Sequence, residues 1–359
     1  MACVKVESVS KYFGDFAAVD DVTAEFKEGT VTVLLGPSGC GKTTLMRMIV
    51  GLEQPTSGRV LVGDVDVTKT PTRKRDIGMV FQYPVIYRGT TVARNLELPL
   101  KAAGMNPAVR KKRIEETAEL IGIENLLESN VDTLGNEGRQ KVAMARELAR
   151  QPEVLLFDEP ITNVDLASKL ELKRSLKRLF TEYKQTIIYV THDQTEAMSF
   201  ADNIALMDKA RIVQFDKPRA IYDDPNNAFA GWFLGSPGMN FIERAISVSG
   251  TEVKSPLLKK KIAVRSASNN PTTLGIRPER VEASLKEKPG YIKARVFEKA
   301  LTIGGRFMLD LEVDDLTFKA IVAHDLGKEA SEAIWVNLPE ASVRLFDQNG
   351  NKVPIKTAD

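Results

Sequence analysis

Short apolar runs recur through the first two thirds of the chain and alternate with stretches of helical periodicity. Each run has four or five residues, most of them apolar and many β-branched. Strands of this kind are buried on both faces, which is typical of a parallel sheet covered by helices. The pattern therefore predicts an α/β domain with strands over Val31–Leu35, Ile77–Phe81, Val154–Phe157, Thr186–Val190 and Ile204–Met207.

The pattern changes between about residue 83 and residue 150. Ala108–Ile121 and Glu137–Arg150 are charged segments with an apolar face at helical spacing. We expect them to form a helical subdomain that is inserted between two strands of the sheet.

A period of two prevails after about Gly235. Apolar residues alternate with polar ones over 307–313 and again over 316–322, and Asp314-Asp315 separates the two segments, as in a β-hairpin. Turn pairs such as Pro289-Gly290 separate further short strands, which is typical of a small β-barrel. We therefore expect two domains, residues 1–235 and residues 236–359, the second of them β-rich.

Composition agrees with a globular protein of more than one domain. A chain of 359 residues exceeds one typical core, and 43% apolar with 27% charged residues excludes extensive disorder. A formal net charge of +2 gives no indication of nucleic-acid binding. Two cysteines are too few for a disulfide framework and favour a reducing compartment.

No segment predicts a membrane-spanning helix or a signal peptide. The longest apolar stretches have four to six residues, whereas a membrane helix needs ~20. Charged residues such as Lys5 and Glu7 interrupt the N-terminus. Any role at a membrane is therefore expected to depend on partner proteins.

A glycine-rich loop follows the first apolar run. Its sequence matches G-x-x-x-x-G-K-[ST], and a helical pattern continues to Gly51. In this context the backbone N–H groups bind phosphates, Lys42 reaches the β- and γ-phosphates, and Thr43 binds Mg²⁺. The alternative is a chance glycine-rich turn, and for Cys40 we expect packing rather than redox chemistry. The loop comprises Gly36, Pro37, Ser38, Gly39, Cys40, Gly41, Lys42 and Thr43.

Two acidic residues, Asp158 and Glu159, directly follow the run Val154–Phe157. The carboxyl end of this strand is expected beside the glycine-rich loop, because parallel sheets bind their ligands at that edge. There Asp158 would hold Mg²⁺ or its water, and Glu159 would polarise the attacking water. The alternative is a solvated acidic pair that caps the next helix.

With these motifs in this order, the chain resembles the ATP-binding subunits of ABC transporters along essentially its whole length. The resemblance implies a P-loop NTPase fold of the ABC type with a helical subdomain, and ATP and Mg²⁺ as cofactors. It also implies that Phe13, in Val9-Ser10-Lys11-Tyr12-Phe13-Gly14, stacks on adenine. Tyr12 is the alternative to Phe13, and packing in the core is the other interpretation of either aromatic residue.

Three further motifs extend the resemblance. Gln82, after Gly78-Met79-Val80-Phe81, is similar to the glutamine that senses the γ-phosphate and borders the permease groove. Asp165 resembles the acid that touches the opposite monomer. His192, at the end of an apolar strand, resembles the switch histidine, which can stabilise the charge on a transferring phosphoryl group. For His192 the alternative is a helix cap.

The C-terminal third has a narrower resemblance. Residues 229–241 look like the junction found in maltose-type importer ATPases, and Leu274-Gly275-Ile276-Arg277-Pro278-Glu279-Arg280 looks like part of their OB-like regulatory domain. Such importers carry oligosaccharides, glycerol phosphates or related solutes. Similar tails occur in importers of polyamines, iron and molybdate, so the solute stays open between these classes.

One motif departs from the family. The signature Leu-Ser-Gly-Gly-Gln is replaced by Leu134-Gly135-Asn136-Glu137-Gly138, ahead of a recognisable basic helix. In the family this segment caps the γ-phosphate that the opposite monomer binds. Gly135 supplies no hydroxyl, and Glu137 would bring a negative charge toward the phosphate unless it points to solvent. We therefore expect a heterodimer with a second ABC ATPase whose signature is intact, and a homodimer is the alternative.

The resemblance and the motifs together define the expected site. Catalysis is assigned to Glu159, His192, Gln82 and Asp158, and Mg²⁺ binding to Thr43, Gln82 and Asp158. Nucleotide binding is assigned to Phe13, Gly36, Pro37, Ser38, Gly39, Cys40, Gly41, Lys42, Thr43 and Thr44.

The expected partners are transmembrane permease subunits, which meet the segment from Gln82 to Tyr87, and indirectly a solute-binding protein, but no nucleic acid. The aromatic residues of that segment have local core packing as their alternative. The expected location is the cytoplasmic face of the inner membrane. Two rival functions are a regulatory ABC subunit that hydrolyses little ATP and an ABC ATPase that acts on DNA or ribosomes.

Overall fold

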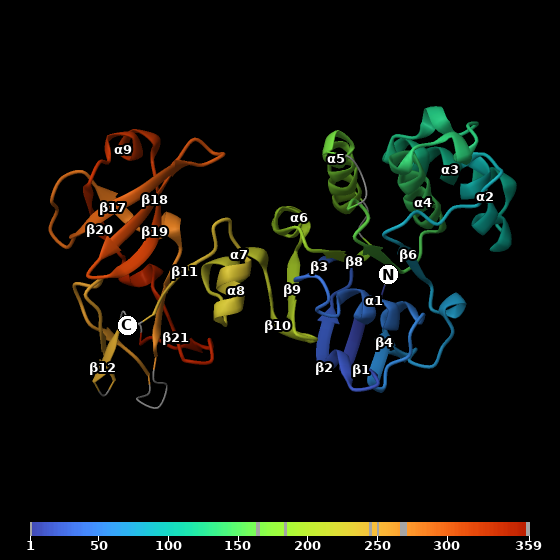
Figure 1. Cartoon of the computed structure of the whole chain (residues 1–359). Coiled ribbons are helices and arrows are strands. Elements are labelled where there is room, and N and C mark those ends of the chain that lie inside the picture. Colours follow the sequence, from blue (N-terminus) through green and yellow to red (C-terminus); the bar gives the residue numbers. More distant parts are fainter. Residues whose placement is uncertain are drawn as a thin grey trace. The chain divides into compact units, whose positions relative to one another are not determined.

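The computed structural model describes residues 2–162, 166–182, 185–243, 246–249, 251–265 and 271–356. The chain forms two compact units, Met1–Pro218 and Arg219–Asp359, each of which is described by itself (Figure 1). Packing thus places residues 219–235 in the second unit, whereas the sequence assignment ends the first domain after residue 235. That functional boundary stays a prediction.

The first unit contains the predicted, mostly parallel sheet. Its six strands have the order β10-β9-β3-β8-β7-β6, and only the β9–β10 pair is antiparallel. All five predicted apolar runs form strands of this sheet, and the central strands β3, β7 and β8 are buried along their whole length. The bounds are β3 Val31–Leu35, β6 Ile77–Val80, β7 Val154–Asp158, β8 Thr186–Thr191, β9 Asn203–Asp208 and β10 Arg211–Asp216.

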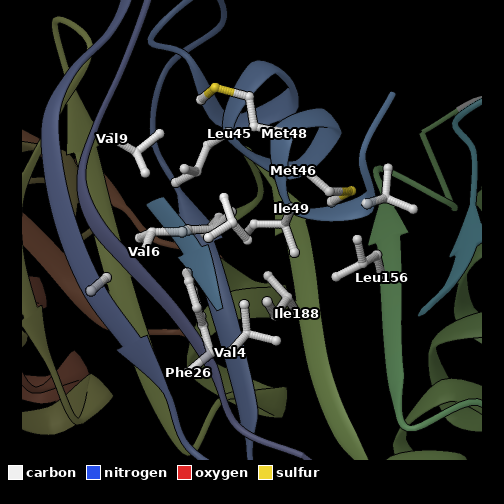
Figure 2. Packing of buried hydrophobic residues seen from close by; sticks show 14 of the residues in the cluster. Val4, Val6, Val9, Phe26, Leu45, Met46, Met48, Ile49, Leu156 and Ile188 are labelled. Atoms are coloured by element: carbon white, nitrogen blue, oxygen red, sulfur yellow. The ribbon is translucent and has the colours of Figure 1, made fainter. Parts of the chain in front are cut away.

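A second, antiparallel sheet shares a core with the first through helix α1 (Lys42–Val50). Leu45, Met46 and Ile49 of α1 belong to one buried cluster with Val6 of the antiparallel sheet and Leu156 of β7 (Figure 2). Burial of each such aliphatic side chain contributes ~1.5–3 kcal/mol, so the packing fixes α1 against both sheets. The antiparallel sheet has the order β2-β1-β4-β5, with β1 Val4–Phe13, β2 Phe16–Phe26, β4 Ser57–Val62 and β5 Val65–Asp66.

The helical subdomain contains the two predicted helices and one more. The two predicted helices are observed as α3 (Pro107–Ile121) and α4 (Asn136–Arg150). The additional helix, α2 (Val92–Ala102), begins at Thr91, whose hydroxyl accepts a hydrogen bond from the Arg94 amide. An N-cap threonine before apolar residues at i, i+4 and i+8 is a sequence signal that predicts this helix.

The remaining helices of the first unit follow strands of the parallel sheet. They are α5 (Leu166–Glu182) after β7 and α6 (Gln194–Phe200) after β8. Single 3₁₀ turns lie at Thr72–Lys74, Glu124–Leu126 and Val131–Thr133.

The second unit is β-rich, as the alternating pattern predicts. Its five-stranded sheet has the order β16-β20-β17-β18-β19, and smaller sheets have the orders β11-β15-β21-β22 and β12-β13-β14. The strands are β11 Asn240–Glu243, β12 Ser247–Ser249, β13 Glu252–Lys254, β14 Ile262–Ala263, β15 Thr273–Ile276, β16 Glu282–Ser284, β17 Ile292–Leu301, β18 Phe307–Val313, β19 Leu316–Val322, β20 Ala333–Asn337, β21 Arg344–Phe346 and β22 Lys352–Val353. The helical turns are α7 Pro218–Asp223, α8 Ala228–Phe233, α9 His324–Glu329, Pro278–Arg280 and Glu340–Ser342.

The predicted hairpin is observed between β18 and β19. Val313 pairs with Leu316, and Asp314 and Asp315 both adopt positive φ, 47° and 63°. Two left-handed residues form the tight turn that matches the twist of the flanking strands. Leu309 and Leu311 on one strand and Phe318 on the other are buried, so the period-two pattern correctly assigned the core face.

Arg277 connects the helices α7 and α8 to the rest of the second unit. Its buried guanidinium donates to the carbonyl oxygens of Tyr222 (3.1 and 2.9 Å), Gly231 (2.8 Å) and Leu234, and its central carbon lies 4.0 Å from the centre of the Tyr222 ring. A planar fork of donors suits several carbonyl groups at once. This residue therefore gives the Ile276-Arg277-Pro278 segment a structural role.

Replacing Arg277 by Leu should destabilise the second unit by about 3 kcal/mol, because buried carbonyl groups lose their donors. Urea unfolding followed by tryptophan fluorescence isolates this unit, since both tryptophans, Trp232 and Trp335, belong to it. The matched control is Arg280→Leu, which breaks a half-exposed pair with Asp223 (3.3 Å) and should change stability by less than about 0.5 kcal/mol. Equal midpoints for the two variants would contradict the assignment.

Candidate functional site

The glycine-rich loop joins the carboxyl end of β3 to the first turn of α1. A Cβ atom on Gly36 would lie 2.3 Å from the carbonyl oxygen of Met207, and one on Gly41 would lie 2.2 Å from that of Ala18. Gly41, the residue before the helix, also has a φ of 105°, which side chains rarely adopt. The loop is thus pressed against neighbouring backbone at both ends, and only glycine fits there.

Lys42 is buried and lies across the inner side of the loop. Its Nζ donates to the carbonyl oxygens of Gly36 (2.9 Å) and Pro37 (2.8 Å). The first-turn amides of α1 have no intrahelical acceptor, so they and Lys42 form a concentrated set of donors for an anion. Cys40 is buried 3.8 Å from Lys42 Nζ, and burial raises the pKa of its thiol, as expected of a packing residue.

A cavity of about 410 Å³ opens over this loop. It brings the loop together with residues from the ends of two other segments, Gln82 after β6 and Glu159 after β7. Its lining in the described part of the chain is Phe16, Ala18, Ser38, Gly39, Gly41, Lys42, Thr43, Thr44, Gln82 and Glu159. The lining residues that the sequence assignment omitted are Phe16 and Ala18.

Phe16 provides an exposed aromatic face beside the loop, with 63% of its surface accessible. It is the cross-strand partner of Phe13 over the two-residue turn between β1 and β2. Phe13, which the sequence assigned to adenine, lies outside the cavity lining and has Lys11 Nζ at 4.9 Å from its ring centre. The alternative, Tyr12, donates its hydroxyl to Asp20 (2.8 Å). The pairing of Phe13 with Phe16 across a tight turn is the sequence signal that would have identified Phe16.

Asp158, which does not line the cavity, forms a pair of oxygen ligands with Thr43, which does. Thr43 Oγ1 donates to Asp158 Oδ1 at 3.0 Å. Burial raises the pKa of Asp158, and the Thr43 hydrogen bond partly offsets the effect. A carboxylate, a hydroxyl and the nearby amide of Gln82 are hard oxygen donors of the type that Mg²⁺ prefers, so these residues fit the ion.

Glu159 and His192 face each other across the ends of adjacent parallel strands. Glu159 Oε2 lies 3.1 Å from His192 Nδ1 and accepts a hydrogen bond from Thr162 Oγ1 at 3.2 Å. Glu159 has a φ of 44°, and its amide donates to the Val190 carbonyl of β8 (3.1 Å). A left-handed conformation at a non-glycine residue costs free energy, and here the hydrogen bond to Val190 helps to maintain it.

The atypical segment 134–138 forms the start of helix α4. Gly135 is the N-cap and makes no side-chain capping hydrogen bond. Glu137 forms an ion pair, because its carboxylate lies 2.8 Å from Lys141 Nζ. The same ammonium group lies 3.2 Å from the carboxylate of Glu171 on α5. This ion pair reduces the negative potential that the sequence alone attributes to Glu137. Asp165, the expected contact to an opposite monomer, lies outside the described residues.

Within the described residues, no helix is both long and apolar enough to cross a membrane.

The chain matches known families over both units. The family model described as "ABC transporter" matches residues 19–162, and the one described as "MalK OB fold domain" matches residues 235–281. A relative named sn-glycerol-3-phosphate import ATP-binding protein UgpC 2, from Agrobacterium fabrum, is 37% identical over 97% of this chain and 93% of its own length. Another, named trehalose/maltose import ATP-binding protein MalK, from Thermococcus litoralis, is 35% identical over 98% and 99%.

Solved structures agree with the fold of the first unit. A dimeric post-hydrolysis state of the ATP-binding cassette MJ0796, bound to ADP and Pi, superposes with a TM-score of 0.54 at 30% identity, and covers 60% of this chain and 99% of its own. The structure of cbiO1 from Clostridium perfringens gives a TM-score of 0.56 at 27% identity, covering 61% and 89%. Together with the two family models, these structures confirm the predicted fold class.

The raised pKa of Asp158 predicts that its negative charge destabilises the folded, nucleotide-free protein, and that this destabilisation depends on pH. The folded state binds the proton of Asp158 more tightly than the unfolded state does. Above the folded-state pKa, the ionised carboxylate therefore lowers the free energy of unfolding. Below the ordinary value of 3.8 the carboxyl group is protonated in both states, and this loss of stability disappears. Asp158→Asn should therefore have a higher thermal midpoint than the wild type at neutral pH, and the difference should vanish as the pH falls toward that value. Asp64→Asn, at an exposed position, is the control that should show no such difference. A wild type more stable than Asp158→Asn at pH 7 would refute the effect.

Proposed function

The chain belongs to the ATP-binding subunits of ABC transporters, and we propose that it hydrolyses MgATP to energise an importer of sugars or related solutes. The observation that carries the proposal is the contact of Glu159 with His192 (3.1 Å) at the edge of the cavity that Lys42 and the glycine-rich loop line. A carboxylate that can accept a proton thus stands beside a donor-rich phosphate site.

The residues divide the reaction between them. Lys42 and the first-turn amides of α1 bind the β- and γ-phosphates and balance their charge. Thr43, Asp158 and Gln82 would hold Mg²⁺, which neutralises phosphate charge when bound. Glu159 orients the attacking water and accepts its proton, while His192 donates a hydrogen bond to the phosphoryl oxygens.

The adenine contact is assigned to the exposed aromatic pair at the β1–β2 turn. Phe13 keeps the role proposed from the sequence, and Phe16 joins it because it lines the cavity. An adenine ring can stack on either face at this turn, since both rings are at least half exposed.

The names of the relatives support the proposed solute class. The names of three relatives similar over nearly the whole chain mention sn-glycerol-3-phosphate, trehalose/maltose and sulfoquinovosyl glycerol. All three are polyhydroxy compounds, which supports a sugar or glycerol-phosphate solute over a polyamine, metal or simple anion.

Permease subunits are proposed to bind the segment that follows Gln82. Tyr83, Val85 and Tyr87 are exposed there, Tyr83 to 69%, which favours contact with a partner over local core packing. Arg146 of α4 lies 5.2 Å from the Tyr87 ring and connects this surface to the helical subdomain. Such an assembly would place the chain at the cytoplasmic face of the inner membrane.

A second, different ATPase remains the proposed partner. Gly135 has no side chain, so this chain lacks the hydroxyl that would meet the phosphate of the opposite monomer. The pairing of Glu137 with Lys141 moderates the charge effect but supplies no such hydroxyl. In a heterodimer, one composite site would combine this chain's Lys42, Asp158 and Glu159 with the partner's signature; a homodimer would contain two altered sites.

Glu159→Gln tests the proposed hydrolysis. Loss of the proton acceptor should lower kcat by about 10²–10⁴-fold while nucleotide affinity is retained. The measurement is phosphate release by the assembled transporter, with ATP binding followed by a fluorescent analogue. In a regulatory subunit that hydrolyses little ATP, the substitution would leave turnover almost unchanged, and that result would favour the rival function.

The heterodimer predicts weak ATPase activity for the purified chain alone. Restoring a glycine and a hydroxyl in the signature, with Gly135→Ser and Glu137→Gly together, should raise this activity at least about tenfold, because a donor returns to the phosphate. The control is the same pair of substitutions with Glu159→Gln, which should stay inactive. Brisk turnover by the unaltered chain alone would exclude the need for a different partner.

A further inference from the structure

A buried polar network lies directly behind His192. Glu196 of α6 is only 5% exposed, and its Oε2 accepts hydrogen bonds from the hydroxyl groups of Tyr189 and Thr191, both at 2.8 Å. Both donors lie on β8, the strand that ends immediately before the histidine. Glu196 therefore holds the end of the strand from which His192 projects.

Lys173 connects the network to a third element, helix α5. Its Nζ lies 3.3 Å from Glu196 Oε1 and 3.1 Å from Asp193 Oδ2. The other carboxylate oxygen of Asp193 caps α6 by accepting from the amides of Thr195 (2.7 Å) and Glu196 (3.2 Å). One ammonium group thus joins the buried carboxylate of Glu196 to the partly exposed carboxylate of Asp193, which would otherwise repel each other.

The network holds the backbone on both sides of the histidine. Thr191 donates to Glu196 and accepts from the Asp193 amide at 3.0 Å, so the residues before and after His192 are joined to each other. The His192 side chain itself is 48% exposed, and Nδ1 lies against Glu159. Little packing surrounds the imidazole, so its position depends on the backbone that carries it.

We propose that Lys173 and Glu196 are positioning residues for His192, which they hold at hydrogen-bonding distance from Glu159 during ATP hydrolysis. The proposal rests on the catalytic role assigned to His192 above. A displacement of about 1 Å at a catalytic group lowers rates by up to ~10²-fold, so the removal of this network should be visible in turnover. Neither residue lines the cavity, so nucleotide affinity should not depend on them.

Lys173→Met tests the proposal in the assembled, ATP-hydrolysing transporter. We expect kcat to fall at least about tenfold with little change in the affinity for a fluorescent ATP analogue. Lys173→Arg, which keeps the charge and both partners within reach, should restore most of the activity. Lys177→Met removes an exposed lysine one turn along the same helix and should leave kcat unchanged.

A double variant separates positioning from general loss of stability. In the His192→Gln background, Lys173→Met should cause no further loss of kcat, because the group it positions is already absent. Independent, multiplying losses would overturn the proposal. Glu196→Gln, which keeps the acceptor for Tyr189 and Thr191, serves as a second variant if Lys173→Met folds poorly, and should lower kcat in the same non-additive way.

Histidine spectroscopy supplies a readout without turnover. The chain has only two histidines, His192 and His324, and the second lies in the other unit. In a protein with ¹³C-labelled histidine, Lys173→Met should shift or broaden the His192 imidazole signal and leave that of His324 in place. An unmoved His192 signal with wild-type kcat would refute the positioning role. An inactive wild type, or a His192→Gln variant with full activity, would instead refute the function on which the proposal rests.

Discussion

The parallel pairing of β6, β7 and β8, with β3 beside β8, is the constraint on which the site depends. In parallel strands the carboxyl ends meet at one edge of the sheet, so Gln82, Asp158, Glu159 and His192 emerge beside the glycine-rich loop that follows β3. The registers Val80–Phe157 and Asp158–Val190 set how far each chain segment extends beyond this edge. Because β7 and β8 are buried on both faces, a shift of register would change which side chains pack against the covering helices, so close packing maintains these registers.

Two lysine ammonium groups, those of Lys42 and Lys141, have oxygen partners within this chain. Lys42 lies against loop carbonyl groups, and the Lys141 ammonium lies between Glu137 and Glu171. Each arrangement lowers the cost of holding a charge away from water. Lys42 can exchange its carbonyl partners for phosphate oxygens, whereas Lys141 neutralises a residue that replaces part of the usual signature. The negative charge that Glu137 introduces is therefore balanced inside this chain, whereas the hydroxyl that Gly135 lacks is not replaced.

The second unit is stabilised differently from the parallel sheet, because its sheets have few strands that are buried along their whole length. Alternation along β18 and β19 builds a one-sided core, and the buried Arg277 donates to carbonyl groups at the ends of α7 and α8. The segment Ile276-Arg277-Pro278, noticed in the sequence as a family resemblance, thus has a stabilising function. Its hydrogen bonds explain why residues 219–235 pack with the C-terminal unit.

The sequence by itself determined the elements and the chemistry that depend on local pattern. Apolar runs and alternation predicted the sheet strands and the β18–β19 hairpin, and the spacing of glycines, Lys42 and Thr43 predicted the phosphate loop, since these signals depend on near neighbours along the chain. Only the tertiary structure decided which distant residues meet. Phe16 shares a cavity lining with Gln82 and Glu159, Lys141 of α4 meets Glu171 of α5, and Lys173 of α5 meets Asp193 and Glu196. Such contacts depend on the packing of elements far apart in the sequence, which local pattern does not specify.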